Sequence, residues 1–163
     1  MTTKKGSKVM TKAVGDGAKG QKRRYVRLEI FSPVGFAAIV VEDGKRVRLH
    51  PDKKAGVLLN LSGGGALISS TDQATSGELV LMKFDIKGFD ALTNVLGRVK
   101  RVEEQDDGER LIGIEFLSPE QLGDPVLETA LTRLTEHPKD FADGLSRLIS
   151  RYVFARQVEA EKE

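Results

Sequence analysis

Turn signals recur roughly every 8–12 residues through the first two thirds of the chain, and this spacing constrains the fold more than any other sequence feature. The Asp-Gly pairs at residues 43–44 and 107–108 each predict a tight hairpin, since glycine adopts a positive φ at no steric cost. Residues 32–35, which include a proline, predict a break between two strands. Three consecutive glycines at residues 63–65 mark a special backbone position. The chain therefore predicts an antiparallel barrel or sandwich of short strands.

The segments between the turns are rich in β-branched and aromatic residues, whereas the last 45 residues change to a helical period. Asp124 followed by Pro125 predicts a helix start, and a second helix is expected after residue 138. We divide the chain into a flexible basic arm (1–21), a β-barrel (22–118) and a C-terminal helical extension (119–163). The expected strands are residues 26–31, 36–42, 45–49, 57–61, 66–70, 78–86, 92–102 and 111–116.

Charge is distributed unevenly along the chain. Residues 1–27 hold nine cationic side chains and one acid, a net charge of +8, whereas the remaining residues hold 17 cations and 23 acids, a net charge of −6. A basic arm joined to an acidic body is suited either to an anionic ligand or to its own body. Residues 1–20 contain little that a core could bury, so we expect them to be disordered.

The residues that most catalytic and metal sites require are scarce. The chain has no cysteine and only two histidines, His50 and His137, which excludes thiolate nucleophiles, cysteine-based zinc sites and a three-histidine metal site. A GxGxxG pattern at residues 15–20 precedes a β segment rather than a helix, which favours a linker over a dinucleotide-binding loop. The longest apolar run, residues 36–41, is too short to span a membrane, and the N-terminus lacks a signal-peptide core. We expect a cytoplasmic, non-enzymatic domain without a metal.

Two short motifs remain unexplained by turns or charge patterning. Arg23 and Arg27 form an RxxxR pattern where the basic arm meets the first strand, and Asn60, Ser62 and Gly65 form an NxSxxG pattern 33 residues later. Alone, the first is typical of a solvated strand entry, and the second of an Asx-type turn closed by a glycine with positive φ. Each occurs once, in this order, on an all-β chain, so the combination predicts a binding site.

In this combination the sequence resembles the PilZ family, whose signature is RxxxR followed some thirty residues later by (D/N)xSxxG. The resemblance covers residues 22–119, including Gly-Arg-Val at 97–99 and Gly-Ile-Glu-Phe at 113–116. It implies a six-stranded antiparallel β-barrel, here with two C-terminal helices, that binds the bacterial second messenger cyclic di-GMP and signals to an effector protein. The ligand-binding residues that it implies are Arg23, Arg27, Asn60, Ser62 and Gly65, with Arg24 as an additional cation.

These residue types suit the two phosphodiesters and two guanines of that ligand. The planar fork of arginine binds phosphate oxygens and also reads guanine O6 and N7. Asn60 and Ser62, two apart in strand geometry, are expected on one face, and Gly65 is expected to let the backbone turn where a Cβ would clash with the ligand.

Two alternative functions stay open. A basic arm on a small β-barrel also suits a nucleic acid, although aromatic residues make up only 6% of the chain and provide no stacking strand. A degenerate barrel that docks on a partner without any ligand is the other alternative. The sequence leaves open the effector, the number of ligand molecules bound and whether the chain forms a homo-oligomer.

Overall fold

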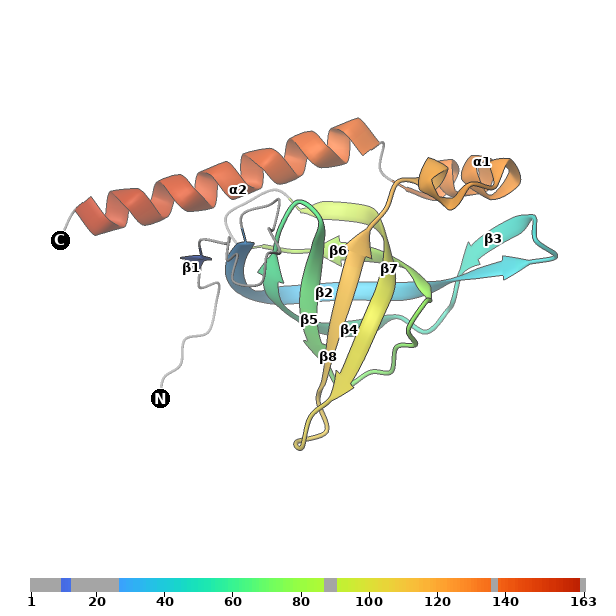
Figure 1. The fold of residues 1–163 in the computed structure, drawn as a ribbon, viewed down its shortest axis with the longest axis horizontal. Coiled ribbons are helices and arrows are strands. Elements are labelled where there is room, and N and C mark those ends of the chain that lie inside the picture. Colours follow the sequence, from blue (N-terminus) through green and yellow to red (C-terminus); the bar gives the residue numbers. More distant parts are fainter. Residues whose placement is uncertain (1–9, 13–26, 87–90, 136–137, 162–163) are drawn as a thin grey trace, which may run out of the picture.

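The computed structural model describes residues 10–12, 27–86, 91–135 and 138–161 of the chain (Figure 1). Strands come first and helices last, as the change of sequence period predicts. The elements are β1 (Met10–Lys12), β2 (Arg27–Glu42), β3 (Arg46–Leu49), β4 (Lys54–Leu61), β5 (Gly65–Ser70), β6 (Leu79–Phe84), β7 (Leu92–Glu104), β8 (Arg110–Phe116), the 3₁₀ helix η1 (Pro119–Leu122), α1 (Pro125–Leu134) and α2 (Pro138–Glu161).

Six of these strands close into an antiparallel barrel. The order around it is β2-β4-β5-β8-β7-β6, and β6 pairs back with β2. The short strand β1 and the strand β3 each add to β2 outside this ring. The six-stranded antiparallel barrel expected from the sequence is thus confirmed.

The strand β2 is continuous over 16 residues, so the predicted break at residues 32–35 is wrong. Pro33 pairs with Val57 of β4 and lies just before Val34, where the ladder to β6 begins. A residue without an N–H is tolerated at the end of a ladder. A separate bulge, where the register with β4 shifts between Glu29 and Ser32, bends the strand. The bent strand pairs first with β4, then with β6 and finally with β3.

The two expected Asp-Gly hairpins are present with different loops. In the first hairpin Asp43 and Gly44 both have positive φ angles, 57° and 66°, and the register pairs Glu42 with Arg46, so that residues 43–45 lie between the strands. At the second hairpin, Gln105 donates its N–H to the carbonyl of Glu109 and only Gly108, at φ 87°, lies in the left-handed region. That turn therefore has three loop residues, in the form of a turn followed by a left-handed glycine.

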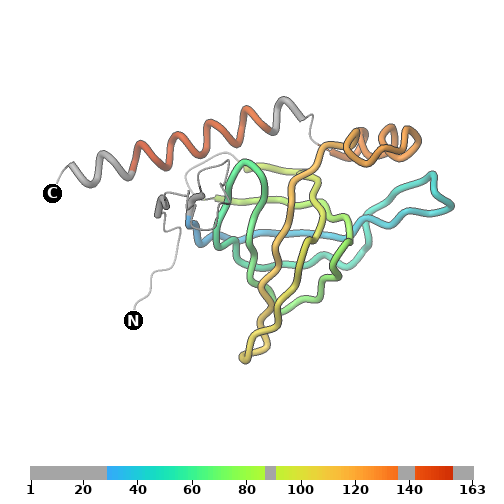
Figure 2. The backbone as a smooth tube through the Cα atoms, in the orientation of Figure 1, coloured from blue at the N-terminus to red at the C-terminus, as the bar shows by residue number. Residues whose placement is uncertain are grey.

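The barrel interior forms one apolar core, and α2 closes one end of it. Phe84 is fully buried and packs edge-on against Phe116, with ring centroids 6.1 Å apart. Leu145, Leu148 and Tyr152 of α2 belong to the same buried cluster as the barrel side chains. Figure 2 shows α2 lying across the barrel, above it in this view. The apolar face of the helix is therefore the face that covers the core.

A second, smaller core lies between α1 and the outside of the barrel. Leu131 of α1 is fully buried there against Ile39, Leu81 and Leu96 of three barrel strands. The helix begins as predicted, since the carboxylate of Asp124 accepts hydrogen bonds from the backbone N–H groups at positions 126 and 127, at 3.0 and 3.3 Å. One helix thus closes the barrel end and the other covers part of its wall.

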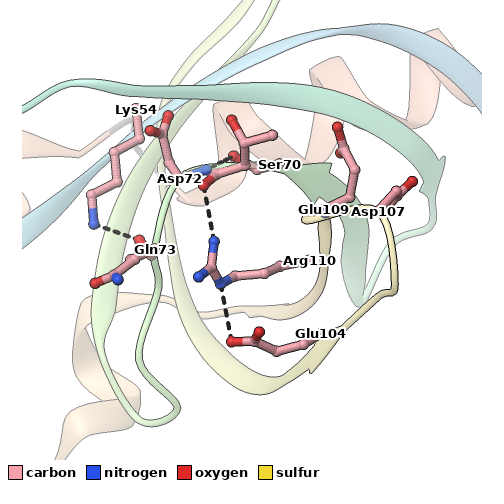
Figure 3. Close-up of polar contacts among 9 residues, drawn as sticks. Lys54, Ser70, Asp72, Gln73, Glu104, Asp107, Glu109 and Arg110 are labelled. Carbon is pink, nitrogen blue, oxygen red and sulfur yellow. Dashed lines mark hydrogen bonds and ion pairs between the residues drawn. The ribbon is translucent and has the colours of Figure 1, made fainter.

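Polar contacts tie together the strand ends near the β7–β8 hairpin (Figure 3). Arg110, at the start of β8, donates from Nη1 to the main-chain carbonyl of Thr71 at 2.9 Å and from Nε to the carboxylate of Glu104 at 3.3 Å. Its side chain is 19% exposed. Nearby, the ammonium group of Lys54 donates to the carbonyl of Gln73 at 2.6 Å. These bonds join the loop after β5 to its neighbouring strands.

We expect Arg110→Ala to lower the free energy of unfolding by about 1.5–2 kcal/mol, since it removes a largely buried charged side chain that donates to the carbonyl of Thr71 and to Glu104. Arg48→Ala is the matched control, because Arg48 also pairs with a glutamate, at 2.9 Å, but its side chain is 53% exposed. An exposed pair of this kind contributes about 0–1 kcal/mol. Urea unfolding of both variants measures the difference, and equal losses would contradict a structural role for the Arg110 contacts.

Candidate binding groove

A shallow groove of about 400 Å³ crosses the outer face of four neighbouring strands, β4, β5, β8 and β7. It is the size of a small-molecule site, although it is open to solvent. Three of the predicted ligand-binding residues lie in it. Its lining residues are Asn60, Ser62, Gly64, Gly65, Ala66, Leu67, Lys100, Arg101, Gly113, Ile114 and Glu115.

The turn from β4 to β5 is held by its own serine. The N–H of Ser62 donates to the carbonyl of Gly65 at 3.0 Å, and the N–H of Gly64 donates to the Ser62 hydroxyl at 3.2 Å. The carbonyl of Gly64 in turn accepts from the N–H of Phe116 at 3.0 Å. The turn is therefore anchored to β8, which fixes the position of the serine in the groove.

Gly65 is required by the packing of two strands. Its φ is not positive, so the turn is not the Asx-type turn closed by a left-handed glycine. A Cβ at this position would instead overlap with the carbonyl oxygen of Ile114 on β8. The close approach of β5 to β8 accounts for the missing side chain before any ligand is considered.

Asn60 reaches the groove through an irregularity in β4. The pairing of β4 with β5 shifts register between Leu58 and Asn60. Leu58 and Leu61 are fully buried in the barrel, so the two residues between them share the outer side. Asn60 and Ser62 both line the groove.

Two cations of the groove, Lys100 and Arg101, were missed in the sequence. The register of β7 against β8 shifts between Val99 and Arg101, so Lys100 is an extra residue in the strand. Val99 is buried and Val102 packs against the same core, which leaves both cations between them exposed. The signal was available, because two apolar residues three apart with two charges between them break the two-residue alternation of a regular strand.

The arginine motif meets the groove through the backbone of β2. Leu28 pairs with Leu61 and Glu29 with Asn60, so the preceding residue, Arg27, lies at the register position beside the end of β4. The side chain of Arg27 lies outside the described residues. Arg23 and Arg24 lie outside them entirely. The register therefore brings the end of the RxxxR segment next to the NxSxxG turn.

Neither a metal-binding group nor a membrane-spanning helix is found in the described part of the chain. Within residues 10–12, 27–86, 91–135 and 138–161, no three His, Asp or Glu side chains are grouped so that they could hold a metal ion. Among the same residues, no helix has the length and apolar character needed to cross a membrane.

The family model described as PilZ domain matches residues 21–136, well over half of the chain. The chain belongs to the PilZ family. The match spans both motifs, the six barrel strands and α1, whereas α2 follows it. This match confirms the resemblance that the two motifs indicated. PilZ domains are, in general, non-enzymatic receptors and adaptors for cyclic di-GMP.

One solved structure similar to this PilZ domain is that of the Bacillus subtilis inhibitor of motility (MotI/DgrA). The two chains share 18% sequence identity, with a TM-score of 0.44 over 69% of this chain. The match spans 51% of the length of that chain. No curated protein sequence matches this one.

Proposed function

We propose that this chain is a cytoplasmic, non-enzymatic receptor that binds cyclic di-GMP in the groove and passes the signal to an effector protein. Asn60 at the end of β4 offers an amide and Ser62 in the following turn offers a hydroxyl. Gly65 places no side chain between the backbone and the ligand. Arg23 and Arg27 close over the ligand from the segment that precedes β2, with Arg24 as a third cation. The ligand-binding unit is residues 22–118, and the helical extension is residues 119–163.

The observation that carries this proposal is the register of β2 against β4. Glu29 lies opposite Asn60 in that register, which places Arg27 within a few residues of the NxSxxG turn although 33 residues separate the motifs in sequence. A guanidinium fork in that position can pair with a phosphodiester or with the O6 and N7 atoms of guanine.

Ligand binding then changes the conformation of the protein by ordering. The segment of residues 1–27 carries a net charge of +8, so its cations repel one another in the absence of an anion, although residues 10–12 within it pair with β2 as β1. A bound dianion holds Arg23 and Arg27 against the barrel, so that this segment and the surface beside it adopt one arrangement. That arrangement is the signal that an effector reads.

A calorimetric titration of the full chain with cyclic di-GMP at physiological salt tests the proposal. We expect saturable binding with a Kd of about 1 μM or tighter, and no binding of cyclic di-AMP, which lacks the guanine acceptor pair. The number of ligands per chain comes from the same curve. A flat titration would overturn the proposal and favour the ligand-independent domain, and displacement of cyclic di-GMP by excess RNA would favour the nucleic-acid alternative.

A further inference from the structure

The groove has two walls, and the PilZ motifs account for only one of them. Asn60, Ser62 and Gly65 form the wall on β4 and β5. The other wall is formed by Lys100 and Arg101 on β7, two strands away from β5. Neighbouring strands lie about 4.8 Å apart, so the two walls are separated by about 10 Å. One small ligand can touch both.

The bulge in β7 fixes where these two cations point. In a regular strand, consecutive side chains alternate between the two faces. Because Lys100 is inserted between Val99 and Arg101, the lysine and the arginine are both exposed on the outside of the barrel. A single irregularity thus doubles the positive charge on this wall.

The side chain of Arg101 lies over a glycine. Arg101 pairs with Gly113 of β8, and a Cβ built on Gly113 would meet both Cγ and Nε of the arginine at 3.4 Å. The stem of Arg101 therefore rests on the bare backbone of Gly113, and both residues line the groove.

One carboxylate lies in the same groove. Glu115 of β8 pairs with Lys100, with an Oε1–Nζ distance of 3.6 Å, and both side chains are about half exposed. This contact holds the ammonium group in the groove, yet the carboxylate also repels any anion that binds there. The described lining therefore carries two positive charges and one negative charge.

We propose that Lys100 and Arg101 form a second anion-contacting wall, at which the ammonium group meets a phosphodiester of cyclic di-GMP and the guanidinium group pairs with or stacks on the ligand. This inference rests on the proposed function, and it adds residues that lie outside the RxxxR and NxSxxG motifs. It also assigns Glu115 a role of opposite sign, as a residue that weakens binding of the dianion.

Calorimetric titration of full-length variants with cyclic di-GMP tests the two cations. We expect Lys100→Ala to raise the Kd about 3-fold and Arg101→Ala about 10-fold. The matched controls are Lys83→Ala and Arg46→Ala, which remove the same charge from exposed positions outside the groove and are expected to shift the Kd less than about 2-fold. Arg101→Lys keeps the charge but loses the planar fork, so it should restore only part of the affinity.

Glu115→Gln tests whether the carboxylate in the groove weakens ligand binding. It removes one negative charge and leaves a side chain of the same size, so we expect the Kd to fall about 3-fold. Wild-type affinity in both Lys100→Ala and Arg101→Ala, alongside weakened binding in Asn60→Ala, would overturn the second wall and leave the proposed function standing. Absence of binding by the wild-type chain would remove the proposed function and this inference with it.

Discussion

Gly65→Ala is expected to lower the free energy of unfolding by about 3 kcal/mol, at the upper end of what overpacking usually costs. The added Cβ would overlap with the main-chain carbonyl oxygen of Ile114, and backbone cannot move aside as a flexible side chain can. Relief requires β5 and β8 to separate, although the pairing between them runs over six residues and closes the barrel. Urea unfolding of the variant measures the loss.

Gly113→Ala is the matched control for this prediction. Its Cβ would also lie between neighbouring strands, but it would meet only the side chain of Arg101, at 3.4 Å, which is ordinary contact. Because alanine is also more favourable than glycine in a strand by about 0.5–1 kcal/mol, we expect little net change in stability. Equal destabilisation of both variants would contradict the close approach of β5 to β8 as the reason for the glycine at position 65.

The distinction matters for the NxSxxG motif, because its three residues serve the fold to different degrees. Gly65 is required by the packing of two strands, and Ser62 anchors the turn through its hydroxyl. The Asn60 side chain lines the groove, and no structural bond of comparable kind accounts for it among the described contacts. Loss of affinity in Asn60→Ala therefore reports on ligand contact more directly than the same loss in a Gly65 variant.

The barrel could be predicted because its local signals agree with one another. Turn residues, strand composition and the switch to a helical period all favoured strands first and helices last. The predicted break at residues 32–35 was wrong because proline alone indicates a strand end, whereas β2 continues through Pro33 in regular pairing with β4. Tertiary pairing decides such a position, and it is invisible in a single segment.

The groove, too, could be predicted from the sequence only in part. The NxSxxG residues could be found from sequence because the motif is local, and the structure brings all three into one groove. The sequence signals that Lys100 and Arg101 share the outer face of β7, but it does not assign them to the same groove, since that requires the strand order β5-β8-β7. The position of α1 on the outer wall likewise could not be predicted, because it depends on a second core to which three barrel strands contribute.

Arg23→Ala and Arg27→Ala are each expected to raise the Kd for cyclic di-GMP about 10–100-fold, the loss of about 1.5–3 kcal/mol that a hydrogen bond to a charged group contributes. Lys22→Ala is the matched control, because it removes one positive charge from the same segment at a position outside the motif. Removal of one charge outside the motif should alter the Kd by about 2-fold or less. Arg27→Lys should recover part of the affinity only, since an ammonium group is a point charge without a planar fork.

Four outcomes of these titrations separate the roles of charge and geometry. If Lys22→Ala weakens binding as much as Arg27→Ala, the segment acts as a diffuse cation, and the RxxxR spacing has no special part. If Arg27→Lys binds like the wild type, charge alone is sufficient at that position. Wild-type titration of both alanine variants would refute the arginine assignment, even though the β2–β4 register brings position 27 beside Asn60 and Ser62. Only a large loss of affinity in both Arg23→Ala and Arg27→Ala, with near-normal binding by Lys22→Ala, supports two guanidinium forks that converge on one dianion.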